Sequence, residues 1–124
     1  MKAAITYKDK VPLFEDHHYE IRELVQSYAA EKVAPRAREL DETKRFPHET
    51  VAEVRELGLL GVPFPEEWGG AGLDYLAYTI VVEELARACG TTAITCAAHT
   101  SLGTNPIHEF GTPRQKEKYL KKLA

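Results

Sequence analysis

A long run without a single Asp, Glu, Lys or Arg, Ala88 to His108, constrains the fold more than any other feature. In a chain that is 28% charged, such a run is expected to be covered by the rest of the protein. A membrane-spanning helix also avoids charges, but it needs about 20 predominantly apolar residues. This run contains many Thr, Ser and Asn residues and two histidines. We therefore expect a buried central helix.

One face of this expected helix has an unusual mixture of side chains. Four residues follow the spacing i, i+3, i+4 and i+7, namely Thr95, Ala98, His99 and Leu102. Small, mildly polar and apolar groups together suit a wall beside a ligand. Small residues also let neighbouring helices approach closely, and on the pattern alone this packing role is the simpler interpretation.

Composition limits the class of protein. The 124 residues are 44% hydrophobic, which is enough for one globular domain. A net charge of -3 provides no general attraction to nucleic acid or anionic lipid. Cys89 and Cys96 share a helical face about 10 Å apart, beyond disulfide reach, so we expect free, buried thiols in a reducing compartment. No signal-peptide core is present near the N-terminus.

Hydrophobic spacing predicts an all-α domain of about five to six helices. Residues 1–13 are expected to form an extended lead-in, and residues 14–124 the helical domain. A helix should begin near Asp16, and Pro35 should end or bend it near Val33 because the residue before proline avoids helical angles. A short second helix is then expected over 36–43.

The second half of the chain has clear helix-start and helix-stop signals. A helix over 48–57 should end at Gly58, before a Gly- and Pro-rich loop over 61–73 that holds the only tryptophan, Trp68. Asp74 should cap the next helix, which runs to Ala88. The charge-free helix should start at Thr91 or Thr92 and be disturbed over 103–106. Thr112 and Pro113 then open a basic last helix.

Several kinds of functional site can be set aside. The chain has neither a GxxxxGK[ST] phosphate loop nor a GxSxG nucleophile motif, and no strand precedes the glycines at 69–72. A di-iron centre needs two Glu-x-x-His pairs, and the single one, Glu15 to His18, is read as chance. No metal site and no catalytic residue are predicted.

The remaining polar residues are given structural roles. We interpret the other histidines, except His99, as surface or capping residues: His17, His48 and His108. Glu83 and Glu84 are read as the polar edge of their helix, and the basic residues over 114–122 as a solvated face.

Several segments together resemble the N-terminal domain of the acyl-CoA dehydrogenases. They are Phe46-Pro47, ELGLLGVPFPEEWGGAGL at 56–73, EELA at 83–86, HTSLG at 99–103, Pro106-Ile107 and FGTPRQKEKYLKKLA at 110–124. Each is weak alone, but their order and spacing are specific, and weaker likeness reaches back to about Phe14. The resemblance covers nearly the whole chain.

The resemblance implies a longer flavoprotein that oxidises acyl-CoA thioesters with FAD and passes electrons to an electron-transfer acceptor. It places most of the FAD site and the catalytic glutamate in a middle β-domain and a C-terminal helical domain. No FAD ligand or catalytic base is therefore assigned here. The N-terminal domain is expected to supply a wall of the acyl pocket, which by position would be Thr95, Ala98, His99 and Leu102. That agreement with the face found above favours the ligand-wall interpretation.

Two alternatives stay open at this point. The chain could be a stand-alone helical binding module, or part of a related acyl-CoA oxidase or flavin monooxygenase. For the dehydrogenase, the resemblance implies a cytoplasmic bacterial or, second, a mitochondrial matrix location. It also implies homo-oligomers, no nucleic acid partner and no membrane span. Exposed apolar surface and self-association are expected if the domain stands alone.

Overall fold

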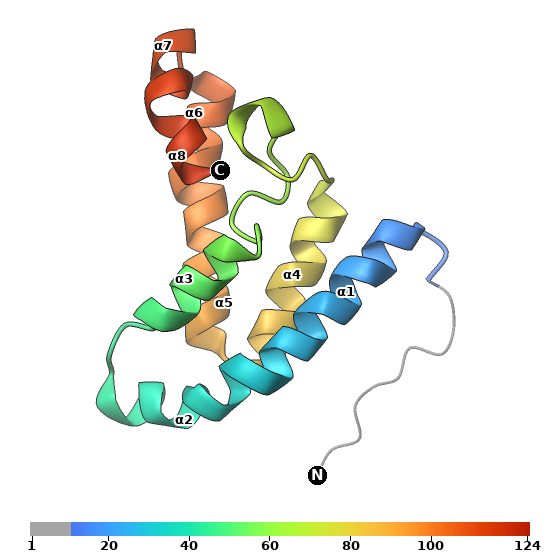
Figure 1. Cartoon of the computed structure of the whole chain (residues 1–124), viewed down its shortest axis with the longest axis vertical. Helices are drawn as coiled ribbons and strands as arrows, with labels where there is room; N and C mark the ends of the chain where they lie inside the picture. The colour runs from blue at the N-terminus through green and yellow to red at the C-terminus, as the bar shows by residue number, and fades with distance from the viewer. Residues whose placement is uncertain (1–10) are drawn as a thin grey trace.

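Helices and the loops between them make up residues 11–124, the part of the chain that the computed structural model describes. Figure 1 shows them as a bundle in which α1, α4 and α5 lie side by side. Within residues 11–124 there is no strand, which confirms the all-α prediction. The predicted lead-in over 1–13 lies mostly outside these residues.

The α-helical segments join through widened turns into five continuous helices. Along the chain the segments are α1 (Asp16–Tyr28), η1 (Ala29–Val33), α2 (Ala34–Thr43), α3 (His48–Glu56), η2 (Glu66–Trp68), α4 (Tyr75–Ala88), α5 (Gly90–Ala98), η3 (His99–Thr104), α6 (Asn105–Phe110), α7 (Pro113–Gln115), η4 (Lys116–Leu120) and α8 (Lys121–Leu123). The short η2 is a 3₁₀ helix, and η1, η3 and η4 are π-helical.

The first helix does not stop before Pro35. It continues from α1 through η1 into α2, so the predicted second helix to Thr43 is present, but no break separates it from the first. In η1 the turn widens, and the Ala34 N–H donates to the carbonyl of Ala29, five residues earlier. Proline lacks an N–H and its ring clashes with the carbonyl four residues before it, and a widened turn relieves that clash. In Figure 1 the helix changes direction where α1 meets α2.

Several predicted helix ends are confirmed. Asp74 accepts a hydrogen bond from the Ala77 N–H at 2.8 Å and caps α4. Thr112 forms a reciprocal capping box with Gln115. Gly58 follows α3 with a φ of 73°, a left-handed conformation that costs glycine little.

The long loop is braced by its own backbone. Leu73 donates to the carbonyl of Val62 at 3.0 Å, and Ala71 donates to that of Gly61 at 2.9 Å. Phe64 is fully buried. A Cβ on Gly70 would collide with the Phe64 backbone, so only glycine allows this approach.

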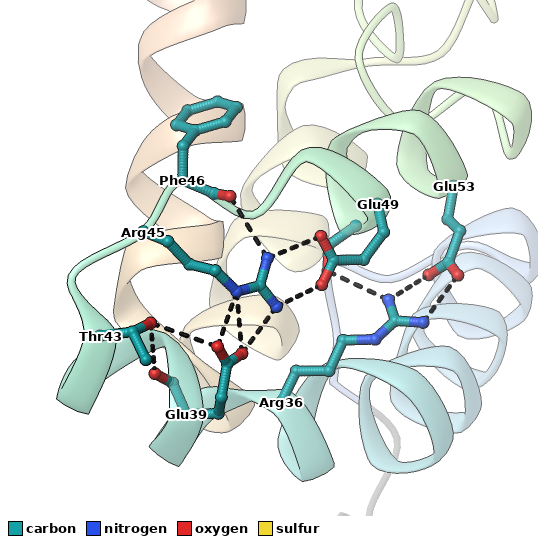
Figure 2. A network of polar contacts seen from close by, with 8 residues as sticks. Arg36, Glu39, Thr43, Arg45, Phe46, Glu49 and Glu53 are labelled. Atoms are coloured by element: carbon teal, nitrogen blue, oxygen red, sulfur yellow. Dashed lines mark hydrogen bonds and ion pairs between the residues drawn. The ribbon is translucent and has the colours of Figure 1, made fainter.

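A charged cluster joins α2 to α3 (Figure 2). The Arg45 guanidinium bonds Glu39 and Glu49, each at 2.6 Å. Arg36 donates to Glu53 at 2.7 Å, and the Tyr28 hydroxyl donates to Glu53 at 2.9 Å. These ion pairs and hydrogen bonds hold the connection between α2 and α3, which includes Phe46 and Pro47.

Candidate functional site

The charge-free run forms one helix, α5–η3–α6, with a closed face and an open face. The closed face packs into the core through Thr92, Cys96, Thr100 and Thr104, all buried. On the open face Ile94 is 65% and Leu102 76% exposed. The prediction of a fully buried central helix is therefore wrong for one side, since residues 11–124 leave that side uncovered.

The four predicted wall residues lie in two different environments. Thr95 and Ala98 are half-buried on the open side of α5, and Leu102 is exposed beyond them. His99 instead turns toward the end of the chain, where its Nε2 donates to the Leu123 carbonyl at 2.8 Å. It lines a groove with basic neighbours, among them Arg55, Lys121 and Lys122.

The widened turn η3 explains this separation. The Asn105 N–H donates to the carbonyl of Thr100, five residues earlier, so the turn holds one residue more than an α-helical turn. Successive residues of an α-helix are rotated by about 100° about its axis. One extra residue in a turn therefore rotates the residues after it back by about that angle, relative to a regular helix. The shift keeps Thr104 on the closed face below Thr100, where it is fully buried, while Leu102, two residues after Thr100, points outward. The predicted disturbance over 103–106 is present, but it begins at His99.

Hydroxyl groups along the open face are already hydrogen-bonded within their own helix. Thr95 donates to the carbonyl of Thr91 at 2.8 Å, and Ser101 donates to that of Ala97 at 2.6 Å. Since these two donors are satisfied, an apolar ligand lying over Thr95 and Ser101 would leave neither hydroxyl without a partner. An apolar group could thus cover these two hydroxyls at little desolvation cost.

Both cysteines are free and buried, as predicted. Burial raises the pKa of the Cys96 thiol to about 11, so this side chain is a neutral core residue and a poor nucleophile at neutral pH. Burial likewise raises the pKa of Tyr78, whose hydroxyl stays protonated and can donate.

A cluster that the sequence did not reveal ties the starts of α1 and α4 together. His18 is buried, and its Nε2 lies 3.0 Å from the carboxylate oxygens of Asp74. His17 Nε2 lies 3.2 Å from the same carboxylate. His18 Nδ1 also accepts from the Glu15 N–H at 2.9 Å, a helix-capping contact that the sequence analysis did not predict.

This cluster has the residue types of a metal site, because suitable atoms of His17, His18 and Asp74 lie within 4.8 Å of one another. The hydrogen bonds argue otherwise. A neutral His18 that accepts at Nδ1 carries its proton on Nε2, so that nitrogen donates to Asp74 and has no lone pair for a metal. The arrangement is a capping contact between two helices.

A second correction concerns Glu84. It was read with Glu83 as a polar edge, and Glu83 is indeed exposed, but Glu84 is only 3% exposed. Its carboxylate accepts from Gln26 at 3.0 Å and pairs with Arg22 at 3.4 Å. A hydrophobic spacing pattern cannot find such a residue, because a buried ion pair occupies a core position with a polar side chain.

The other polar predictions hold. His48 is exposed at the first turn of α3, and His108 is half-buried, its ring centroid 5.5 Å from that of Phe64. In the basic segment, Lys121 pairs with Glu117 at 2.7 Å and the lysines at 118, 121 and 122 are exposed. Across residues 11–124 no helix is long and apolar enough to cross a membrane.

Comparison with known proteins agrees with the fold. The family model described as acyl-CoA dehydrogenase, N-terminal domain, matches residues 15–124. The chain therefore belongs to the acyl-CoA dehydrogenase family, as its N-terminal domain.

Relatives come from bacteria and from mitochondria. A short-chain specific acyl-CoA dehydrogenase of Clostridium acetobutylicum is 50% identical over 104 residues, which is 84% of this chain and 27% of the relative. The mitochondrial short-chain specific acyl-CoA dehydrogenase of Mus musculus is 41% identical over 115 residues, 93% of this chain and 28% of the relative. The chain thus spans little more than a quarter of their length.

A solved structure of an acyl-CoA dehydrogenase complexed with FAD, from Bacillus anthracis, matches with a TM-score of 0.82 and 38% identity. The match covers 93% of this chain and 20% of that chain. The helical arrangement described above is therefore the arrangement of this family's N-terminal domain.

Proposed function

We propose that the full-length protein carrying this chain is an FAD-dependent acyl-CoA dehydrogenase, which removes hydrogen from the α and β carbons of an acyl-CoA thioester. Residues 14–124 form its N-terminal helical domain and supply one wall of the acyl pocket. The observation that carries this proposal is the open, charge-free face of α5–η3, on which the Thr95 and Ser101 hydroxyls are already bonded within the helix. An apolar pocket with few polar groups suits such a ligand.

The wall consists of Thr95, Ala98 and Leu102, with His99 at its edge. Thr95 presents its methyl group, because its hydroxyl is bound to Thr91. Ala98 leaves space beside the helix, and Leu102 offers an exposed apolar side chain. His99 holds the last helix through the Leu123 carbonyl, which keeps that helix against the end of the wall.

FAD has no assigned ligand in this chain. The run from 88 to 108 carries no Lys or Arg, so the open face does not fit a flavin diphosphate, which needs cationic or backbone donors. In the full-length protein FAD would accept the hydride. The residues here only shape the space for the acyl chain and exclude water from it.

The whole protein should act as a homo-oligomer in the bacterial cytoplasm, or second in the mitochondrial matrix, and pass its electrons to an electron-transfer acceptor. Exposed Phe110, at 87%, and Leu102 support the view that more protein covers this face. A stand-alone module is the less favoured alternative, since the relatives are dehydrogenases. Peroxide formation under oxygen would instead identify an oxidase.

The test is the acyl-chain profile of Ala98→Phe in the full-length protein. The larger ring should fill the space beside the helix and lower kcat/KM for eight-carbon against four-carbon acyl-CoA by about tenfold or more, since each methylene in a pocket is worth about tenfold or more. Ala52→Phe, at an exposed alanine of α3, is the matched control and should leave the ratio unchanged. An unchanged ratio for Ala98→Phe would remove this face from the pocket.

A further inference from the structure

Hydroxyl groups hold the widened turn η3 in place. Tyr78, from α4, donates to the Ala97 carbonyl at 3.2 Å, and Ser101 donates to the same oxygen at 2.6 Å. At the other end of the turn Thr104 donates to the His99 carbonyl at 2.9 Å. Thr100 anchors its middle by donating to the Leu60 carbonyl at 3.1 Å.

Pro106 explains why a turn is widened here. Its ring would clash with the carbonyl of Leu102 in a regular α-helix, and it supplies no N–H. The widened turn solves this, as it does before Pro35. Proline alone does not fix which residues form the turn, however, because the extra residue could sit one position earlier or later.

The hydroxyl groups fix that position. A widened turn interrupts the regular backbone hydrogen bonds of a helix, and side-chain donors can bond carbonyls beside it. Ala97 is the residue before the last of α5, and both donors converge on its oxygen. Tyr78 matters most because it comes from another helix, so it ties the turn to α4 as well as satisfying the carbonyl.

We propose that Tyr78 is a positioning residue for the acyl pocket. With Ser101 it pins the Ala97 carbonyl, fixes the one-residue shift at η3, and so sets the direction of Leu102 and the acyl-chain length that the wall admits. This inference rests on the proposed function, because it concerns the same wall. Tyr78 touches no substrate and acts through the helix backbone.

The experiment compares two variants of the full-length protein, Tyr78→Phe/Ser101→Ala and Thr79→Val. The first removes both hydroxyls on Ala97 and keeps the Tyr78 ring. The second removes a hydroxyl of α4 that bonds its own helix at an exposed site, Thr79 to Tyr75. Hydrogen exchange is measured for the amides of residues 99–105, and kcat and KM for four- and eight-carbon acyl-CoA.

The double variant should exchange these amides about tenfold faster, the change expected from losing two hydrogen bonds. Its kcat/KM ratio between the two chain lengths should change by about threefold or more, through KM, while kcat for the better substrate is kept. Thr79→Val should alter neither.

Three results would overturn the inference. Unchanged exchange would mean that the hydroxyls do not hold the turn. Faster exchange with an unchanged ratio would mean that the turn does not set specificity. An unchanged ratio in both this variant and Ala98→Phe would reject the wall itself, whereas a shift for Ala98→Phe alone would reject only the role of Tyr78.

Discussion

Two widened turns, η1 and η3, solve the same backbone problem in opposite surroundings. Each ends two residues before a proline, Pro35 or Pro106, and lets a helix continue through it. In η1 the turn is packed into the core, with Val33 fully buried and Ala29 at 4% exposure. In η3 one side is open, and hydroxyl groups hold it. Proline accounts for both turns, but only the second shapes a surface that a ligand could use.

The first turn should depend on packing, and Val33→Asp tests this with the largest expected effect. A carboxylate in that apolar site has no partner, so the free energy of unfolding should fall by about 4 kcal/mol or more. Ala30→Asp places the same residue at an exposed position of the same turn and should cost under about 1 kcal/mol. Denaturant melts of both variants would measure this. Similar losses would mean that burial does not hold η1.

A second prediction, with a smaller expected effect, concerns how stability depends on pH through the ion pair of Arg45 and Glu49. The hydrogen bond from Arg45 lowers the pKa of Glu49 from 4.5 to about 2. A carboxyl whose pKa is lower in the folded state stabilises it above pH 4.5, and that stability is lost as pH falls toward 2. Melting temperatures from pH 6 to 2 should therefore fall less steeply for Arg45→Met than for the unchanged protein. Because these groups are exposed, the difference should be small.

If the melting temperatures of the two proteins fall in parallel with pH, the ion pairs of Arg45 do not stabilise the connection between α2 and α3. No matching effect is expected from η3, since its run carries no Asp, Glu, Lys or Arg. Asp74 also loses its stabilising effect over this pH range, because its pKa is lowered to about 2. The largest cause is the hydrogen bond from the Ala77 N–H, followed by those with His18 and His17. Its contribution is common to both proteins in the comparison.

Local signals in the sequence predicted the helix caps well, because capping depends on a few neighbouring residues. Asp74 and Thr112 cap the starts of their helices as expected, and Gly58 follows the end of α3. A bend near Pro35 was predicted, but the continuity of the helix through η1 was not. Hydrophobic spacing is read with an α-helical period, and a widened turn departs from that period. Glu84 and His18 were missed because their partners, Arg22 and Asp74, lie far away in the sequence.

The candidate wall was predicted only in part for the same reason. An α-helical spacing places Thr95, Ala98, His99 and Leu102 on one face, and that rule fails for His99, which turns toward the end of the chain. Ala98 and Thr95 stay where the spacing put them, and His99 engages Leu123 instead. The exposure of one side of this helix could not be predicted from composition. A charge-free run indicates that the helix is buried, but it does not show which residues bury it.

The most direct measurement is a crystal structure of the full-length protein with a bound acyl-CoA of eight carbons. The proposed wall predicts acyl carbons within about 4.5 Å of Ala98 and Leu102, the usual limit for apolar contact, with η3 still widened and Tyr78 on the Ala97 carbonyl. An acyl chain bound elsewhere, with protein side chains covering this face instead, would contradict it.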